Sequence, residues 1–578
     1  MEPRLHSRIL FLCLGLVAGP STLRAQSQIM SQGAPDGGKI VVTSPFEEPP
    51  QWGFMPFRIE IENPSKRAVD WSVGFSGSGN YNGLGTHNEV ALRAAPGQLT
   101  RQEVMVPAGC IRGDGQSGMY YGNFYLQVHA TPVGWGNFSN NGSGSGDDRG
   151  VVNLRGPGVA AARSDLKGCG FDHRMAPTDW RAYAGYPALY LTDKEWNELE
   201  PGARTAIRQW IRFGGFFGLV RTNSDARPLA DLGLPVSDPG MTNGRSSLGW
   251  VSEVSATKPA AGGKFTSDRL QANMAWRACS GATMQEWRKA AVVGRTGMGR
   301  NLFREDSSVI GGGLMVLVLV VFAIVVGPVN VFVLAPARRR HRLFFTTPII
   351  SLGAGLLLIA AVLLGDGVGG KGARFVWIEN RPGDENMNYV VQHQHSHCGA
   401  VFTTGFDIKE DAFVVPMALD NQQFGGNYSM ELTPGQVSGS GQWFASRTSQ
   451  DFFLSSARPS RGRIEKTGGD DAPRLTSTFE FPLDKVFWLA PDGQTWWQAG
   501  PLSQGTATTL ARCQESDVQA ALGEATATAP AEYNTGLANL RKRPGFFVAL
   551  ADKIPAIETH GGIRWQTHGF VTGPVVTP

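Results

Sequence analysis

Two apolar segments and the arginine-rich turn between them decide how the chain is laid out: VIGGGLMVLVLVVFAIVVGPVNVFVL (309–334), APARRRHRLFFTT (335–347) and PIISLGAGLLLIAAVLLG (348–365). The first segment has 26 residues and no charged side chain. As a helix it is about 39 Å long, enough to cross about 30 Å of hydrocarbon. The second segment is just long enough to return across the bilayer. The sequence therefore predicts a two-helix transmembrane hairpin.

The charges around this hairpin predict its orientation. Four arginines concentrate positive charge in the turn: Arg338, Arg339, Arg340 and Arg342. Short arginine-rich loops stay in the cytoplasm, so 335–347 is predicted to be cytoplasmic and both large flanking regions extracytoplasmic. Residues 1–25 combine early basic residues, a short apolar stretch and Ala25 at a cleavage position, as in a secretory signal peptide, with an uncleaved anchor as the alternative. Together these signals predict an integral protein of a bacterial inner (cytoplasmic) membrane.

Length and charge exclude several classes of protein. A chain of 578 residues is too long for one compact domain. Outside the signal peptide it carries 50 basic and 48 acidic residues, so no basic surface for nucleic acid is expected. Five cysteines remain there: Cys110, Cys169, Cys279, Cys398 and Cys513. An exported compartment permits disulfides, and we expect one bridge in the amino-terminal region, with at least one thiol unpaired because the number is odd.

Residues 35–135 show the alternation of a small β-sandwich. Apolar and charged residues alternate from Phe57 to Ile61, Asn63-Pro64-Ser65 turns the chain, and the alternation resumes over 69–75. A period of two on both sides of a turn favours antiparallel strands with one solvated face. We therefore expect two packed β-sheets in this region.

Residues 150–260 have a different period. A short buried-type strand at 188–191 is followed by apolar residues at helical spacing over 206–211, a Gly214-Gly215 stop and a second buried strand at 216–220. Strand, helix and strand of these lengths predict a parallel α/β unit.

Two further exported segments complete the predicted layout. Residues 261–308 contain Trp276 and Trp287 with basic residues between them, and we expect a helical segment before the membrane. Residues 371–578 begin with aromatic positions such as Phe375 and continue in short aromatic strands, which predicts a second β-rich domain.

Four short motifs carry a resemblance to a known group of proteins. They are Pro177-Thr178-Asp179-Trp180, Ala188 to Leu191, Trp210-Ile211 followed by Gly214-Gly215, and Gly327-Pro328-Val329-Asn330. In this order, with the fourth motif inside the predicted membrane hairpin, they resemble uncharacterised bacterial two-span membrane proteins. The exported domain of those proteins is similar to the class I glutamine amidotransferase fold.

The resemblance implies that fold without amidotransferase chemistry. Amidotransferases of this fold place a nucleophilic cysteine on a tight Gly-x-Cys-x-Gly elbow, with a later histidine and glutamate. Here Cys169 stands in Gly168-Cys169-Gly170 and Cys279 in Ala278-Cys279-Ser280, and neither follows a buried strand within such an elbow. No catalytic residue is therefore assigned.

One dense cluster of metal-binding residue types remains. It comprises His393, His395, His397 and Cys398. On a strand the three imidazoles share one face, each about 7 Å from the next, and histidine or cysteine could bind zinc or copper there. The alternative is a solvated polar strand face.

The sequence thus favours a membrane-anchored envelope protein, not an enzyme, whose exported domains bind or scaffold a protein partner. The bilayer is contacted through two helices, no cofactor is expected, and nucleic acid is excluded as a partner. The alternative function is an exported metal-dependent hydrolase or metal-binding protein that uses the cluster from His393 to Cys398.

Overall fold

A computed structural model describes most of the chain. It covers residues 27–34, 37–46, 53–79, 85–107, 124–131, 134–139, 151–153, 169–186, 188–221, 228–235, 243–246, 249–257, 266–267, 312–366, 369–383, 385–417, 427–526 and 543–577. The predicted signal peptide, residues 1–25, lies outside these ranges. So does the predicted segment 261–308, apart from strand β15 (Thr266–Ser267).

The amino-terminal strands form two sheets. One sheet is antiparallel, in the order β1 (Ser27–Gly33), β2 (Lys39–Ser44), β3 (Phe54–Asn63), β6 (Gln98–Pro107). The other contains β5 (Gly85–Ala94), β4 (Val69–Gly79), β7 (Phe124–Thr131) and β8 (Gly134–Ser139). Alternate apolar residues of β3 and β4 are buried, and Phe57 stacks on Phe75 with ring centroids 5.0 Å apart. The β-rich structure predicted for 35–135 is confirmed, because alternation places every second side chain in the core.

Strands that follow the helical segment 312–366 complete the second sheet. β20 (Asn427–Thr433) runs parallel to β5, with Asn427 opposite Gly85 and Tyr428 opposite Thr86. β21 (Gln436–Gly441) and β18 (Phe406–Ile408) continue the sheet outward from β20. The segments predicted as separate units, 35–135 and 371–578, therefore share one sheet. This pairing joins residues about 340 positions apart, so no local pattern indicates it.

The predicted α/β unit is present as a sheet with five parallel strands. Their order is β10 (Cys169–Gly170), β9 (Val151–Asn153), β11 (Ala188–Thr192), β12 (Phe216–Arg221), β14 (Gly249–Thr257). Two further strands, β13 (Asn243–Ser246) and β15, pair antiparallel with β14. Thr192 caps α2 (Asp193–Glu198) in a capping box with Glu195. α3 (Pro201–Arg212) then buries Ile207, Trp210 and Ile211 against the sheet.

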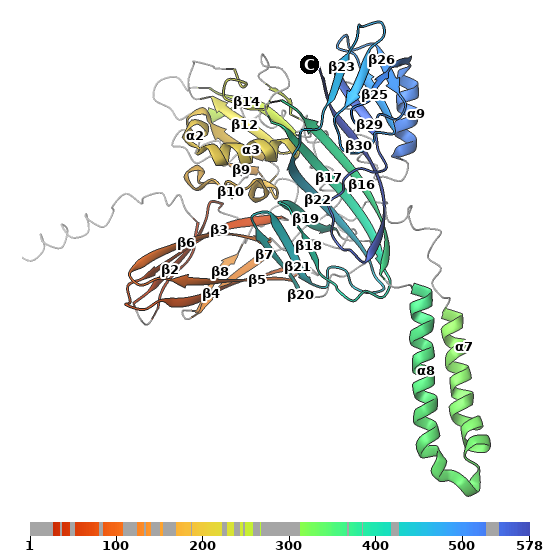
Figure 1. Ribbon diagram of the computed structural model, residues 1–578. Coiled ribbons are helices and arrows are strands. Elements are labelled where there is room, and N and C mark those ends of the chain that lie inside the picture. The colour runs from red at the N-terminus through yellow and green to blue at the C-terminus, as the bar shows by residue number, and fades with distance from the viewer. Residues whose placement is uncertain are drawn as a thin grey trace, which may run out of the picture.

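The carboxyl-terminal region is built on long strands that run side by side in Figure 1. Among the described residues they belong to a 12-stranded sheet with the main order β19 (Ala412–Met417), β22 (Ser449–Pro459), β17 (Met387–Cys398), β16 (Gly370–Arg381), β30 (Ile563–Val576), β29 (Phe546–Leu550), β25 (Lys485–Leu489), β26 (Trp496–Ala499), β28 (Ala511–Cys513). Its further strands are β23 (Ile464–Thr467), β24 (Arg474–Ser477) and β27 (Ala507–Thr509). α9 (Glu515–Ala525) buries Val518 and Leu522 against Phe487 and Val548. The β-rich structure predicted for 371–578 is confirmed, but this region is not a separate domain, because β18, β20 and β21 belong to the sheet of the amino-terminal strands.

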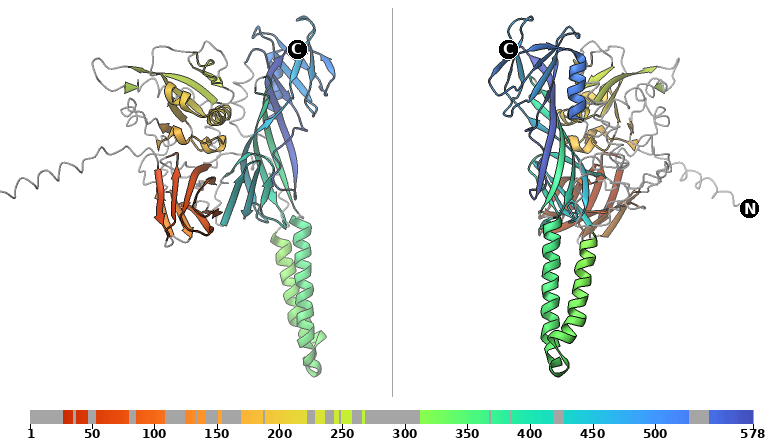
Figure 2. Two further views of the ribbon diagram at one scale, coloured as in Figure 1. Left: turned by 60° about the vertical axis from the view of Figure 1, so that its left-hand side comes forward. Right: turned by 90° about the vertical axis from the view of Figure 1, so that its right-hand side faces the viewer.

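Two helical arms project from this β-rich body as an antiparallel pair (Figures 1 and 2). The first consists of α7 (Gly312–Ile324) and η4 (Val325–Leu334), which is π-helical around Pro328, a residue that cannot donate a helical hydrogen bond. η5 (Ala337–Arg342) is the turn, and α8 (Leu343–Asp366) is the second arm. Asn330 Nδ2 donates a 2.9 Å hydrogen bond to Thr347 Oγ1 of α8.

The two arms differ in whether they are long and apolar enough to cross a membrane. Among the described residues, Ala337–Ala360 is the one helix long and apolar enough to cross a membrane, and Leu319–Leu334 is a shorter apolar helix. Two complete spans therefore stay a prediction.

Aromatic side chains join the sandwich, the α/β unit and the long sheet. Trp180, in the 3-10 helix η3 (Trp180–Tyr183), stacks on Phe213 at 4.2 Å. Phe413 of β19 contacts Phe54 of the sandwich at 5.3 Å and Trp180 at 6.2 Å. All of these rings are buried in one continuous core, so the three units form a single body.

Ion pairs reinforce this junction. The Asp179 carboxylate accepts a hydrogen bond from the Arg181 backbone N–H and forms an ion pair with the Arg181 guanidinium at 2.6 Å. The same guanidinium forms a second ion pair with Asp411 at 3.2 Å. Arg212 pairs with Glu385, whose carboxylate accepts a 3.0 Å hydrogen bond from the Tyr389 hydroxyl. The sequence motif that contains Asp179 and Trp180 thus serves a structural junction between units.

Candidate functional site

Strand β17 carries all of the predicted metal-ligating residues, between β16 and β22. Because side chains alternate along a strand, His393, His395 and His397 lie on one face of the sheet, as the sequence predicted. Cys398 lies on the opposite face, where its Sγ donates to Gln450 Oε1 at 3.3 Å. The structure therefore groups the three histidines and separates the cysteine from them.

The histidine face has a buried acid that sequence reasoning missed. His395 and Asp451 are cross-strand partners in register, and Asp451 Oδ1 is hydrogen-bonded to His395 Nδ1. Both side chains are buried, whereas His397 is exposed and lies 2.9 Å from Ser449 Oγ. Asp451 is 56 residues away from His395, so only the strand register identifies it.

Burial sets the protonation state of His393. It lowers the pKa of this imidazole to about 4, with the neighbouring His395 adding to the lowering and the Asp451 carboxylate opposing it. His393 is therefore neutral at physiological pH, because burial strongly disfavours a charged imidazole.

Metal binding at this face is limited by how many metal-ligating side chains lie close together. A carboxylate bonded to imidazole Nδ1 fixes the orientation of the ring, as it does behind metal-bound or catalytic histidines. Among the described residues, however, no set of three or more His, Cys, Asp or Glu side chains lies close enough to hold a metal ion. Zinc or copper binding by His393, His395, His397 and Cys398 stays a prediction of the alternative function.

Elemental analysis of the purified full-length protein separates the two functions. We expect no stoichiometric zinc or copper, because the described histidine face supplies an incomplete ligand set. The matched control is the His395→Ala, His397→Ala double variant, which we expect to have the same metal content. Stoichiometric metal in the parent protein that is lost from the double variant would establish the metal-dependent alternative.

Thiol chemistry is not favoured at Cys398 and Cys513. Burial raises the pKa of Cys398 to about 11, and burial with the nearby Asp517 carboxylate raises that of Cys513 to about 11. Both free thiols are therefore protonated at neutral pH, whereas a nucleophile must be a thiolate. Cys169 lies within strand β10, and Cys110 and Cys279 lie outside the described residues, so the expected amino-terminal disulfide stays a prediction.

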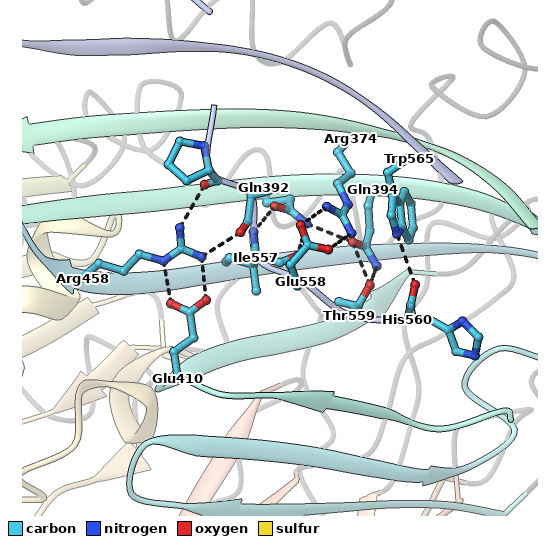
Figure 3. A network of polar contacts seen from close by, with 12 residues as sticks. Arg374, Gln392, Gln394, Glu410, Arg458, Ile557, Glu558, Thr559, His560 and Trp565 are labelled. Atoms are coloured by element: carbon cyan, nitrogen blue, oxygen red, sulfur yellow. Dashed lines mark hydrogen bonds and ion pairs between the residues drawn. The ribbon is translucent and has the colours of Figure 1, made fainter. Parts of the chain in front are cut away.

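The opposite face of β17 carries a polar network around the segment 551–562, which we call the strap (Figure 3). Gln392 holds the strap backbone with two hydrogen bonds, from its Nε2 to Ile557 O at 2.9 Å and from Ile557 N to its Oε1 at 2.7 Å. Gln394 Nε2 donates to Thr559 Oγ1 at 3.1 Å. The side-chain amide of Gln392 thus pairs with the Ile557 backbone, and Gln394 adds a side-chain contact two residues further along β17.

Two arginines fix the strap at either side of these glutamines (Figure 3). Buried Arg374 donates to both Glu558 oxygens at 2.7 and 2.8 Å and lies 4.3 Å above the Trp565 ring. Its hydrogen bonds lower the pKa of Glu558. Arg458 binds Glu410 through two nitrogens and also donates to the strap carbonyls of 555 and 556. These polar groups are bonded to one another, so the network holds the strap on the sheet.

Replacing Gln392 with alanine tests this role. The change leaves the Ile557 N–H and C=O buried without their partner, and we expect unfolding free energy to fall by about 2 kcal/mol. Hydrogen exchange at the Ile557 amide should accelerate before exchange in β16 does. Gln519→Ala, on the exposed side of α9, is the matched control and should change neither quantity. Unchanged exchange at Ile557 would contradict the structural role of Gln392.

Comparisons with known proteins give no family for this chain. No protein-family model and no curated protein matches it. Among solved structures, a calcium-binding mutant of Bacteroides uniformis β-glucuronidase 2 is 8% identical over 32% of this chain and 23% of that chain, with a TM-score of 0.14. The Danio rerio Fcho1 Mu homology domain with bound Eps15 peptide is 8% identical over 36% of this chain and 94% of that chain, with a TM-score of 0.19.

A third structure spans more of the chain. It is a Paenibacillus sp. cycloisomaltooligosaccharide glucanotransferase complexed with cycloisomaltoheptaose, 9% identical over 74% of this chain and 72% of that chain, with a TM-score of 0.18. Such low scores carry no argument about fold or function. None of the three is a glutamine amidotransferase, and the resemblance to that fold stays a prediction.

Proposed function

We propose that this chain is a membrane-anchored envelope protein whose exported body binds or scaffolds a protein partner. The observation that carries the proposal is the distribution of exposed apolar side chains. Among the described residues, every exposed large apolar side chain except Leu99 and Phe402 lies on the helical arms. A body that buries its apolar residues this completely, beside two arms that expose theirs, fits a protein with its arms in lipid.

The dimensions of the arms support two crossings. Residues 312–334 and 343–366 are helical, and at 1.5 Å per residue each arm is about 35 Å long, which matches about 30 Å of hydrocarbon. The π-helical segment around Pro328 shortens the α-helical part of the first arm. The hydrogen bond from Asn330 Nδ2 to Thr347 Oγ1 links polar side chains of the two arms.

The arginine turn supports the orientation. η5 lies at the end of the arms farthest from the β-rich body (Figure 2). With this turn in the cytoplasm, both large regions lie outside, which agrees with the signal peptide predicted for residues 1–25. The location is then the inner membrane of a bacterium.

The junction of the three units supports a scaffold. A rigid body presents binding surfaces in a fixed geometry, and the Phe413 contacts and the Arg212 pair fix the units to one another. Among the described residues, the histidine face has no complete metal-ligand set, and the thiols of Cys398 and Cys513 are protonated at neutral pH. Binding, without catalysis, is therefore the function we favour.

Membrane extraction and reporter fusions test this proposal. We expect the full chain to stay in the membrane pellet after alkaline carbonate treatment. Alkaline phosphatase, which is active only outside the cytoplasm, should be active when fused after Pro578 and inactive when inserted after Arg340. Release of the chain by carbonate would contradict the anchor, and the reverse reporter pattern would contradict the orientation.

A further inference from the structure

The turn at the tip of the helical arms holds uncompensated positive charge. Arg338, Arg339, Arg340, His341 and Arg342 are all exposed. Across the described residues 312–366 the one acidic side chain is Asp366, at the opposite end of α8. Four guanidinium groups therefore share a six-residue turn, and the one carboxylate of residues 312–366 is at the far end of α8.

Aromatic residues fix the depth at which this turn lies. Phe332, Phe344 and Phe345 are 77%, 80% and 67% exposed, and they flank the turn on the two arms. Phe344 is two residues beyond Arg342, which is about 3 Å along a helix. With these rings in the outer hydrocarbon and interface, the arginines lie at the level of lipid phosphate groups.

We infer that the η5 turn is a binding site for the phosphate groups of anionic phospholipids. This inference rests on the proposed membrane anchor and adds a lipid class to it. A guanidinium donates two parallel hydrogen bonds to phosphate oxygens, and clustered arginines at a membrane surface are attracted to net negative headgroups. Zwitterionic headgroups neutralise their own phosphate, so the turn selects anionic lipid.

Lipid analysis of the reconstituted full chain tests the site. The protein is inserted into vesicles of equal phosphatidylcholine and phosphatidylglycerol, excised in polymer-bounded discs, and its lipids are quantified by mass spectrometry. We expect phosphatidylglycerol to be enriched several-fold over its bulk share. The enrichment should disappear in the R338Q/R339Q/R340Q/R342Q variant and persist, at a lower level, in the matched variant with four lysines.

Several outcomes would overturn the inference. Equal enrichment around the parent and glutamine variants would place the selectivity elsewhere. Inorganic phosphate that removes the enrichment, where chloride of the same ionic strength does not, would make the turn a site for free phosphate. Recovery of both lipids without bias would defeat the lipid site and leave the anchor intact, whereas failure to recover any lipid with the protein would defeat the anchor as well.

Discussion

Replacing Phe413 with alanine is expected to lower the free energy of unfolding by about 3 to 5 kcal/mol. Phe413 is completely buried, and its ring contacts Phe54 of the sandwich and Trp180 of the α/β unit. Alanine would leave a cavity where three units meet, and the rigid neighbouring rings can fill it only in part. The effect should therefore reach beyond β19 to the joining of the units.

Two measurements on the detergent-solubilised full chain check this expectation. Urea-induced unfolding gives the loss of stability, and limited proteolysis shows whether the units separate before they unfold. The control is Phe402→Ala, since Phe402 is 91% exposed and its truncation should change stability by less than about 0.5 kcal/mol. If both alanine variants unfold at the same urea concentration, the Phe413 contacts do not hold the body together.

The parts of the fold that depend on neighbouring residues could be predicted from the sequence. Alternation around Ile59 and Ile61 identified buried strand positions, and the helical spacing of Ile207 and Trp210 identified the face of α3 that packs on the sheet. These patterns work because burial repeats with the period of the backbone. The pairing of β20 with β5 could not be predicted, because two strands far apart in sequence meet without a local signal.

In the candidate site, too, the features set by neighbouring residues could be predicted and those set by distant segments could not. A spacing of two placed His393, His395 and His397 on one face, as the structure shows, because strand geometry alone decides it. That spacing also determines the place of Cys398, one residue after His397 and therefore on the other face. Asp451 and the strap come from distant segments, and their contacts depend on tertiary packing that no pattern in β17 records.

The stability of the protein should fall in acid because of His393. Its pKa is lowered from 6.5 to about 4 in the folded protein, chiefly by burial. Between these values the unfolded chain binds a proton at this residue and the folded chain does not, so stability is complete above the higher pKa and declines as the pH falls toward the lower one. A difference of this size corresponds to about 3 kcal/mol across the window.

Unfolding by urea at a series of pH values measures this contribution. In His393→Gln a polar side chain that does not titrate replaces the imidazole, so the variant should lose less stability than the parent between pH 6.5 and about 4. His397→Gln is the matched control, because His397 is exposed on the same strand and face. Parallel pH profiles for the parent and His393→Gln would show that His393 is protonated equally in both states. They would remove the physical basis for treating it as a neutral, buried imidazole beside the His395 and Asp451 pair.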